Sequence, residues 1–197
     1  MSPHVFLGVD VGVTGALAVL CDAPMRIIVS MPLGMQDVDV CPYAVFDTPV
    51  ARVQGAKKTR TEYQPAMMAA LLRNFVGARC TAALELVHSM KGQGVVSTFG
   101  FGRGLGLWEG ILAALRIPYQ LIPPQRWKAA MLHGMGKEKD ASRIAAQRLF
   151  PNADLSLRKH HGRAEALLLA EFLRRLESMN PKYVVSIGTD AVTTKGQ

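Results

Sequence analysis

Two apolar runs separated by a short glycine-rich turn open the chain, and no other feature constrains its fold as strongly. The runs lie within residues 5–20, VFLGVDVGVTGALAVL, and the turn occupies residues 12–15. Apolar runs of this length on both sides of such a turn predict a β-hairpin. The fold is therefore expected to contain a sheet that begins near the N-terminal end.

The rest of the chain alternates between apolar patterns typical of strands and patterns typical of helices. Residues 32–62 are expected to be irregular, and the basic stretch 57–60 within them a mobile loop. A hairpin followed by alternating helices and strands predicts an α/β fold with a mixed central β-sheet flanked by helices. Strands are expected at 27–31, 80–87 and 119–122, and helices at 64–75, from about 99, at 140–149 with Asp140 as N-cap, and from 162 onward.

Length and composition fit a globular, basic protein. The 197 residues suit one domain, expected at 1–180, with a polar tail at 181–197. Hydrophobic residues make up 49% and charged residues 19%, and the net charge is +8. A surface with this excess of Lys and Arg attracts polyanions, of which nucleic acid is the commonest. Charge alone leaves open a protein that is merely basic.

Cysteine spacing and hydropathy exclude several classes. Cys21, Cys41 and Cys80 lie far apart with no CxxC pair, which argues against a zinc ribbon or a disulfide framework and favours a reducing compartment. No apolar run approaches the roughly 18 residues of a membrane span, so no membrane partner is expected. The chain enters a strand almost at once, so no targeting peptide is expected in it, although a removed transit peptide would leave the same start.

Three acidic residues lie within apolar sequence. Asp10 falls in the first expected strand, Glu85 in the strand at 80–87, and Glu165 near the start of the last helix, with His161 four residues earlier on the same face. A carboxylate on a buried strand is costly unless it is paired or coordinates a cation. Three carboxylates brought together would suit Mg²⁺ or Mn²⁺, and two such ions about 3.5–4 Å apart could promote phosphodiester cleavage.

Each of these residues also has an ordinary structural explanation. Asp10 could cap its own turn, and Glu85 could face water from an edge strand. Glu165 could be favoured near a helix N-terminus by the helix dipole, and His161 could form a surface pair with His160. What favours a site is the order in which the three acids occur on the first strand, a later strand and the last helix.

That order resembles the RNase H-like nucleases, and local sequence narrows the resemblance to the RuvC-type Holliday junction resolvases, particularly their plastid members. The resemblance extends from residue 5 to residue 172. It is carried by GVDVGVTGALAV, ALELV, FGFGRGLGLWEGIL, PPQRWKAAM, KDASRIAAQRLFP and KHHGRAEALLLAEF, together with FDTP at 46–49. The HHGRAEALLLA segment is specific, whereas DVGVTG alone is not.

The resemblance implies roles for particular residues. Asp10, Glu85 and Glu165 would bind metal, with His161 as a further ligand, although the family spaces this histidine and acid three apart rather than four. Lys128 and Lys139 would lie near the scissile phosphate, where a cation offsets transition-state charge. Lys128 could equally be an ordinary phosphate-contacting or surface lysine. Other expected DNA contacts are Lys91, Gly92 and Gln93 in a loop that enters the junction centre, and Arg103, Arg126, Arg143 and Arg163 on the DNA backbone.

The resemblance also implies a function. It is the resolution of four-way DNA junctions by paired symmetric nicks through a metal-activated water, by a homodimer with two Mg²⁺ or Mn²⁺ ions per site. The helix from about 99 could provide the dimer face, with Gly100 and Gly104 permitting close approach either to a partner or within the chain. The expected location is the chloroplast, or otherwise a bacterial or phage-infected cytoplasm.

Two other function classes compete with this interpretation. An actin-like or sugar-kinase-type phosphotransfer domain also opens with D-x-G-x-T-G, but such proteins need two domains and a longer chain. A DNA-binding module could keep the fold and lose the chemistry, although all three acids are present. A dinucleotide-binding enzyme is disfavoured, because the glycines at 100–106 never form G-x-G-x-x-G.

Overall fold

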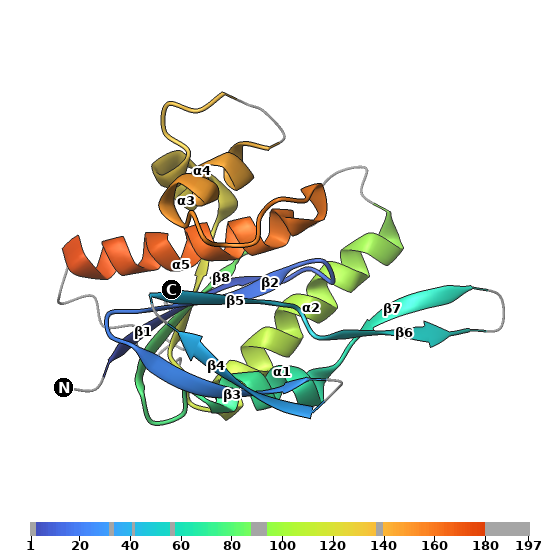
Figure 1. Cartoon of the computed structure of the whole chain (residues 1–197). Helices are drawn as coiled ribbons and strands as arrows, with labels where there is room; N and C mark the ends of the chain where they lie inside the picture. Colours follow the sequence, from blue (N-terminus) through green and yellow to red (C-terminus); the bar gives the residue numbers. More distant parts are fainter. Residues whose placement is uncertain are drawn as a thin grey trace, which may run out of the picture.

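A five-stranded mixed sheet lies at the centre of the computed structural model, which describes residues 3–31, 34–40, 42–55, 58–87, 94–136 and 140–179 (Figure 1). Its strand order is β5-β2-β1-β8-β9, and the strands are β1 (His4–Asp10), β2 (Ala16–Cys21), β5 (Tyr43–Asp47), β8 (Arg79–Glu85) and β9 (Tyr119–Ile122). The first three strands pair antiparallel, whereas β8 and β9 run parallel to β1. The predicted N-terminal hairpin is confirmed, with Asp10 opposite Ala16.

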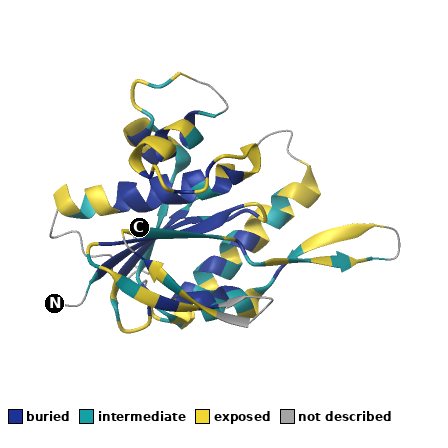
Figure 2. Ribbon diagram, viewed as in Figure 1, coloured by how far each residue is buried: buried dark blue, intermediate teal, exposed yellow. Residues whose placement is uncertain are grey.

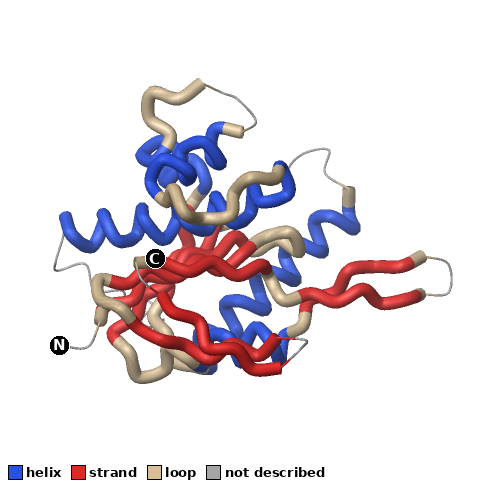
Figure 3. The backbone as a smooth tube through the Cα atoms, in the orientation of Figure 1, coloured by secondary structure: helices blue, strands red, loops and turns tan. Residues whose placement is uncertain are grey.

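Helices cover both faces of this sheet, which confirms the predicted α/β class (Figures 1 and 3). One face carries α3 (Pro124–Met131), α4 (Ala141–Leu149) and α5 (His161–Met179). The other carries α1 (Pro65–Arg73), α2 (Val95–Ala114) and a separate two-stranded sheet of β3 (Met25–Met31) and β4 (Gly34–Val40). Alternate residues of β1 point to opposite faces, so Leu7 lies in the α1–α2 core and Phe6 in the α5 core. Asp10 shares the parity of Phe6 and therefore points to the α5 side.

A second two-stranded ribbon projects from the body of the molecule (Figure 1). It consists of β6 (Val50–Gln54) and β7 (Thr59–Tyr63), paired antiparallel. Most of its residues are exposed or partly exposed, and burial begins only at Tyr63 at its base (Figure 2). The Tyr63 hydroxyl donates to the Val11 carbonyl (3.1 Å), which ties the ribbon to the segment that follows β1.

Several local predictions are corrected by the structure. The segment 32–62 is not irregular, because β4 to β6 and most of β7 lie within it, and Arg60 of the expected loop belongs to β7. The strand predicted at 27–31 forms but pairs with β4 outside the central sheet. Helix α2 begins at Val95 rather than about 99, and α3 was not predicted. Asp140 occupies the N-cap position of α4 without a capping hydrogen bond, because its carboxylate pairs with Arg143.

The long helix α5 crosses β1 with almost no side chain between the two backbones. A Cβ on Gly8 would lie 2.2 Å from the Ala166 carbonyl oxygen and 2.4 Å from the Ala170 nitrogen. Only glycine on the strand and alanine on the helix permit this approach. In the described part of the chain, no helix has both the length and the apolar character needed to cross a bilayer.

Candidate active site

Two of the three predicted acids stand at the ends of neighbouring parallel strands. Val9 of β1 lies beside Leu84 of β8 in the sheet register, so the next residues, Asp10 and Glu85, end the two strands side by side. Both point to the α5 side, because Ala83, two residues before Glu85, packs in that core. Since β8 is flanked by β1 and β9, Glu85 is not an edge-strand residue.

Helix α5 brings the third acid to the same place. A Cβ on Gly162 would lie 2.4 Å from the Thr14 carbonyl oxygen and 2.9 Å from Asp10 Oδ2, so the first turn of α5 sits against the turn that follows β1. Glu165 lies three residues after Gly162, near the start of α5, and is buried. The strand ends and the helix start therefore converge, as the order of the acids predicts.

The pKa values of Asp10 and Glu85 reflect this convergence, because each is raised in part by the neighbouring acids. Burial, followed by the charges of Glu165 and Glu85, raises the pKa of Asp10 from 3.8 to about 7. Burial and Glu165 likewise raise the pKa of Glu85. The hydrogen bond from the Gly12 N–H to Asp10 (3.3 Å) opposes the shift only partly. Both carboxyl groups therefore ionise at a higher pH than an exposed Asp or Glu does.

Glu165 differs, because its partners more than offset its burial. One carboxylate oxygen lies 2.7 Å from Lys128 Nζ, 3.3 Å from His161 Nε2 and 3.1 Å from the Ser142 hydroxyl. Burial raises the pKa of Glu165, but the hydrogen bonds from His161 and Lys128 outweigh it and lower the pKa. The hydrogen bond to Glu165 correspondingly raises the pKa of His161. The adjacent His160 is buried and faces Asp154 instead.

Glu85 has a neutral partner from α3. The indole Nε1 of Trp127 donates to one Glu85 oxygen at 3.1 Å, and Trp127 is fully buried. Because Lys128 follows Trp127 in the chain, two consecutive residues of α3 contact two different acids. Trp127 and Ser142 were not predicted as site residues. The position of Trp127 next to the candidate Lys128 was the one local signal in the sequence. No spacing pattern connects Trp127 with Glu85 or Ser142 with Glu165.

The donor set fits a divalent cation by its chemistry. Three carboxylates and one imidazole are ligands that Mg²⁺ and Mn²⁺ accept, with the carboxylates preferred. Burial first, and then the charges of neighbouring acids, raise the pKa values of Asp10 and Glu85, and a bound cation would favour the ionised form of both carboxyls. Within the described ranges, however, no three His, Cys, Asp or Glu side chains are already grouped as a metal site requires. Glu165 is paired with Lys128 and His161 instead.

The other predicted residues divide into three groups. Lys91, Gly92, Gln93 and Lys139 lie outside the described residues. Arg103 on α2 and Arg126 on α3 are exposed, and Arg126 lies over the ring of Phe172. The remaining two arginines make intramolecular contacts: Arg143 with Asp140 and the carbonyls of Leu155 and Ser156, and Arg163 with Asp47 and Asp154.

Arg163 joins the start of α5 to the end of β5. Its guanidinium donates to both oxygens of Asp47 (2.6 and 2.7 Å) and to Asp154 (2.9 Å). This bidentate geometry is specific to arginine. Asp47 was not predicted as a site residue, because its partner lies far away in the sequence. A DNA phosphate would have to compete with these carboxylates for Arg163.

Comparison with known proteins gives one similar sequence and similar solved structures. The chain is 31% identical over 147 residues, 64% of its length, to "Holliday junction resolvase MOC1, chloroplastic" of Chlamydomonas reinhardtii, and the match spans 17% of that protein. This similarity confirms the resemblance predicted from the sequence. No protein-family model matches the chain.

Two similar solved structures are of RuvC from Thermus thermophilus. The first has 15% identity and a TM-score of 0.48, and the match covers 87% of this chain and 96% of that one. The second is RuvC in complex with Holliday junction substrate, with 12% identity, a TM-score of 0.49, and coverage of 89% and 97%. Scores in this range assign no function.

Proposed function

We propose that this chain is a structure-selective endonuclease of the RuvC type, on an RNase H-like fold, that resolves four-way DNA junctions by paired symmetric nicks. The observation that carries the proposal is the convergence of Asp10, Glu85 and Glu165 at one end of the central sheet. The similarity to a chloroplast protein named a Holliday junction resolvase supports the substrate class.

The acids and Lys128 would divide the work of phosphodiester cleavage. A divalent ion held by Asp10, Glu85 and Glu165 would supply positive charge at the scissile phosphate and lower the pKa of the attacking water. His161 faces Glu165 and would add a nitrogen ligand. Lys128 brings an ammonium group beside the acids, where it would offset the charge that develops on the phosphate. Oxygen-rich donors favour Mg²⁺ or Mn²⁺, and two ions is the number that the resemblance implies.

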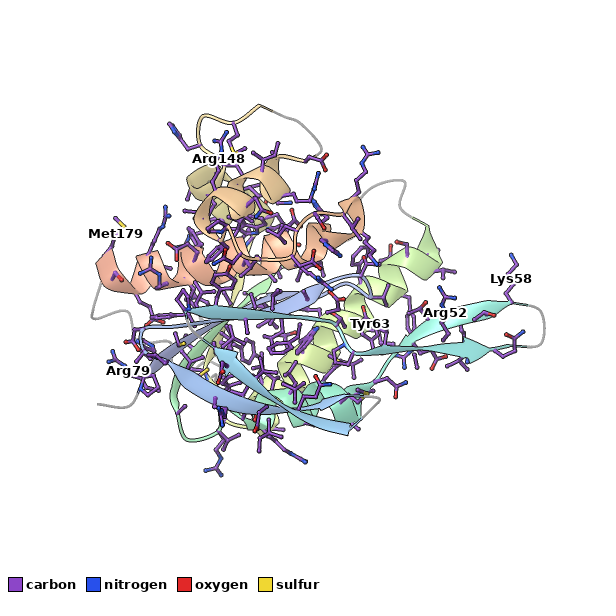
Figure 4. The ribbon with its side chains drawn as sticks, in the orientation of Figure 1. Arg52, Lys58, Tyr63, Arg79, Arg148 and Met179 are labelled. Atoms are coloured by element: carbon purple, nitrogen blue, oxygen red, sulfur yellow. The ribbon has the colours of Figure 1, made fainter. Side chains whose placement is uncertain are left out.

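A basic, exposed β-ribbon supports the binding of a polyanion. Arg52 and Lys58 are exposed and lie on the ribbon that projects from the body of the molecule (Figure 4), and Arg60 pairs with Glu62 on β7. Side chains of this kind contact phosphates without reading sequence. Replacing Arg52 and Lys58 together by alanine should weaken junction binding and reduce its salt dependence. Arg79, at the opposite end of the molecule, provides the matched control, and equal losses in both variants would contradict a role for the ribbon.

The start of α2 is the face we propose for a homodimer. Val95, Val96 and Phe99 are 84%, 87% and 73% exposed, which is unusual for large apolar side chains on one helical segment. Gly104 faces the interior instead, where an added Cβ would lie 2.3 Å from the Tyr63 hydroxyl oxygen. Phe99→Asp should shift the protein from dimer to monomer in sedimentation equilibrium. An unchanged mass would place the dimer face elsewhere.

The location that we propose is the chloroplast, because the similar protein is chloroplastic. The buried Cys80, a free thiol, is compatible with a reducing compartment. Microscopy of a fluorescent fusion in plant or algal cells tests this location, and a signal outside the chloroplast would contradict it.

The deciding experiment offers labelled junction, linear duplex and ATP separately, each with and without Mg²⁺. Symmetric nicks in the junction alone, dependent on Mg²⁺, are the expected result. ATP turnover would favour a phosphotransfer domain, and junction binding without nicks would favour a non-catalytic module. Asp10→Asn should abolish nicking and leave junction binding intact, because Asp10 contributes a ligand rather than a DNA contact.

A further inference from the structure

Two neighbouring residues of α3 hold the acid cluster, one acid each. Trp127 donates its indole N–H to Glu85, and Lys128 pairs with Glu165. The Lys128 ammonium also lies 5.0 Å from the centroid of the Trp127 ring, within the range of a cation–π contact. The indole therefore contacts both the Glu85 carboxylate and the Lys128 ammonium group, which pairs with Glu165.

Trp127 is held rigidly by its surroundings. Its side chain is 0% exposed and packs in the α5-side core with Ile122, Met131 and Ala146. Ile122, the last residue of β9, pairs in register with Glu85, and α3 begins at Pro124 immediately afterwards. Donor and acceptor are thus joined through a strand pair and a proline-started helix, which leaves the indole little freedom to move away from Glu85.

The hydrogen bond engages only one oxygen of Glu85. Among the described residues, the other oxygen has no hydrogen-bond or ion-pair partner. A glutamate side chain at a strand end would otherwise sample several rotamers. A neutral, directional donor can select one of them without neutralising the carboxylate, whereas a lysine or arginine in its place would compete with a cation.

We propose that Trp127 is a positioning residue for Glu85, whose indole N–H holds one carboxylate oxygen and leaves the other directed toward the divalent cation. This inference rests on the proposed function. Hydrogen-bond partners of metal ligands typically change metal affinity or activity about 10- to 100-fold when they are removed. Trp127→Phe keeps an aromatic ring in the core and removes the donor, so its Mg²⁺ affinity should fall by about tenfold or more.

The chain offers a matched control in its second tryptophan. Trp108 is also 0% exposed, and its Nε1 has no hydrogen-bond partner among the described residues. Trp108→Phe therefore makes the same change in the other core without removing a hydrogen bond. Calorimetric Mg²⁺ titration should give a weaker Kd for Trp127→Phe only, with junction binding in EDTA equal in both variants. Equal Mg²⁺ affinities in wild type, Trp127→Phe and Trp108→Phe would overturn the inference.

A fluorescence measurement tests the same point with the Trp127–Glu85 contact intact. Because the chain has two tryptophans, the Trp108→Phe protein emits from Trp127 alone. Its emission should change on Mg²⁺ addition with the midpoint found by calorimetry, and Glu85→Gln should remove that change. If calorimetry shows that Mg²⁺ binds while the Trp127 emission stays constant, the proposed role of Trp127 in positioning Glu85 is wrong, although the proposed function is not. Wild-type protein that neither binds Mg²⁺ nor nicks junctions would overturn the proposed function, and this inference with it.

Discussion

The packing of α5 against the turn after β1 gives a quantitative test of the site. Gly162→Ala adds a methyl group that would lie 2.4 Å from the Thr14 carbonyl oxygen, 2.8 Å from the Gly15 Cα and 2.9 Å from Asp10 Oδ2. Ordinary contacts begin near 3.4 Å, so the helix start has to move by about 1 Å. The two backbone neighbours cannot yield as a flexible side chain would. Overpacking of this kind costs about 1–3 kcal/mol of stability.

The same displacement should reduce catalysis more than stability. Glu165 and His161 lie in the shifted turn, whereas Asp10 and Glu85 stay on the sheet. A misplacement of about 1 Å can cost about 100-fold in rate. Single-turnover nicking at saturating Mg²⁺ and protein should therefore slow about 100-fold for Gly162→Ala, in conditions where urea unfolding shows the variant fully folded.

Gly110→Ala is the matched control. No atom lies within 4 Å of an added Cβ at Gly110, which is exposed in α2. Replacing a mid-helix glycine by alanine should stabilise the protein by about 0.5–1 kcal/mol and leave nicking unchanged. A wild-type nicking rate in Gly162→Ala would refute the argument that the backbone contact at this position sets the relation between the acids.

Three further predictions concern the charges around the site. Since burial and the neighbouring acids raise the pKa of Asp10 to about 7, this group's contribution to stability falls as pH rises from about 4 to 7. Asp10→Asn in EDTA should therefore lose less stability between pH 5 and pH 8 than wild type does, as thermal unfolding would show; parallel pH profiles would contradict the raised pKa. Lys128→Met should slow nicking about 100- to 1,000-fold with junction binding in EDTA nearly intact, and a comparable loss of binding would make Lys128 mainly a phosphate contact. Asp47→Asn should destabilise the fold by about 1 kcal/mol if Arg163 acts as an intramolecular link, whereas tighter junction binding would identify Arg163 as a DNA contact released from competition.

The elements that were predicted from the sequence are those with a local apolar signal. The hairpin of β1 and β2 and the helix α5 each bury a long apolar pattern, and the apolar strand β9 ends in the buried Ile122; each was found at or near its expected position. The ribbon of β6 and β7 escaped prediction because, apart from Tyr63 at its base, none of its residues is buried and it carries no core pattern. Asp140 occupies the predicted N-cap position of α4, but its carboxylate pairs with Arg143 and makes no capping hydrogen bond.

The candidate site was only partly accessible from the sequence. The order of Asp10, Glu85 and Glu165 predicted a cluster, but their adjacency depends on the β1–β8 register, which pairs residues far apart in the chain. Contacts such as Trp127 with Glu85 and Arg163 with Asp47 join separate elements, and no spacing rule connects them. Such contacts follow from tertiary packing and become visible only with the fold.

The crowded carboxylates have a consequence for the behaviour of the resting protein. Without a cation, the repulsion between these carboxylates acts between the start of α5 and the ends of β1 and β8. Gly8 and Gly162 allow α5 to pack closely against β1 and the turn that follows it. An ion that binds the folded chain alone adds stability in proportion to the logarithm of its concentration. The metal-free protein would then be less stable around the three acids, and metal binding would stabilise this region before DNA binds.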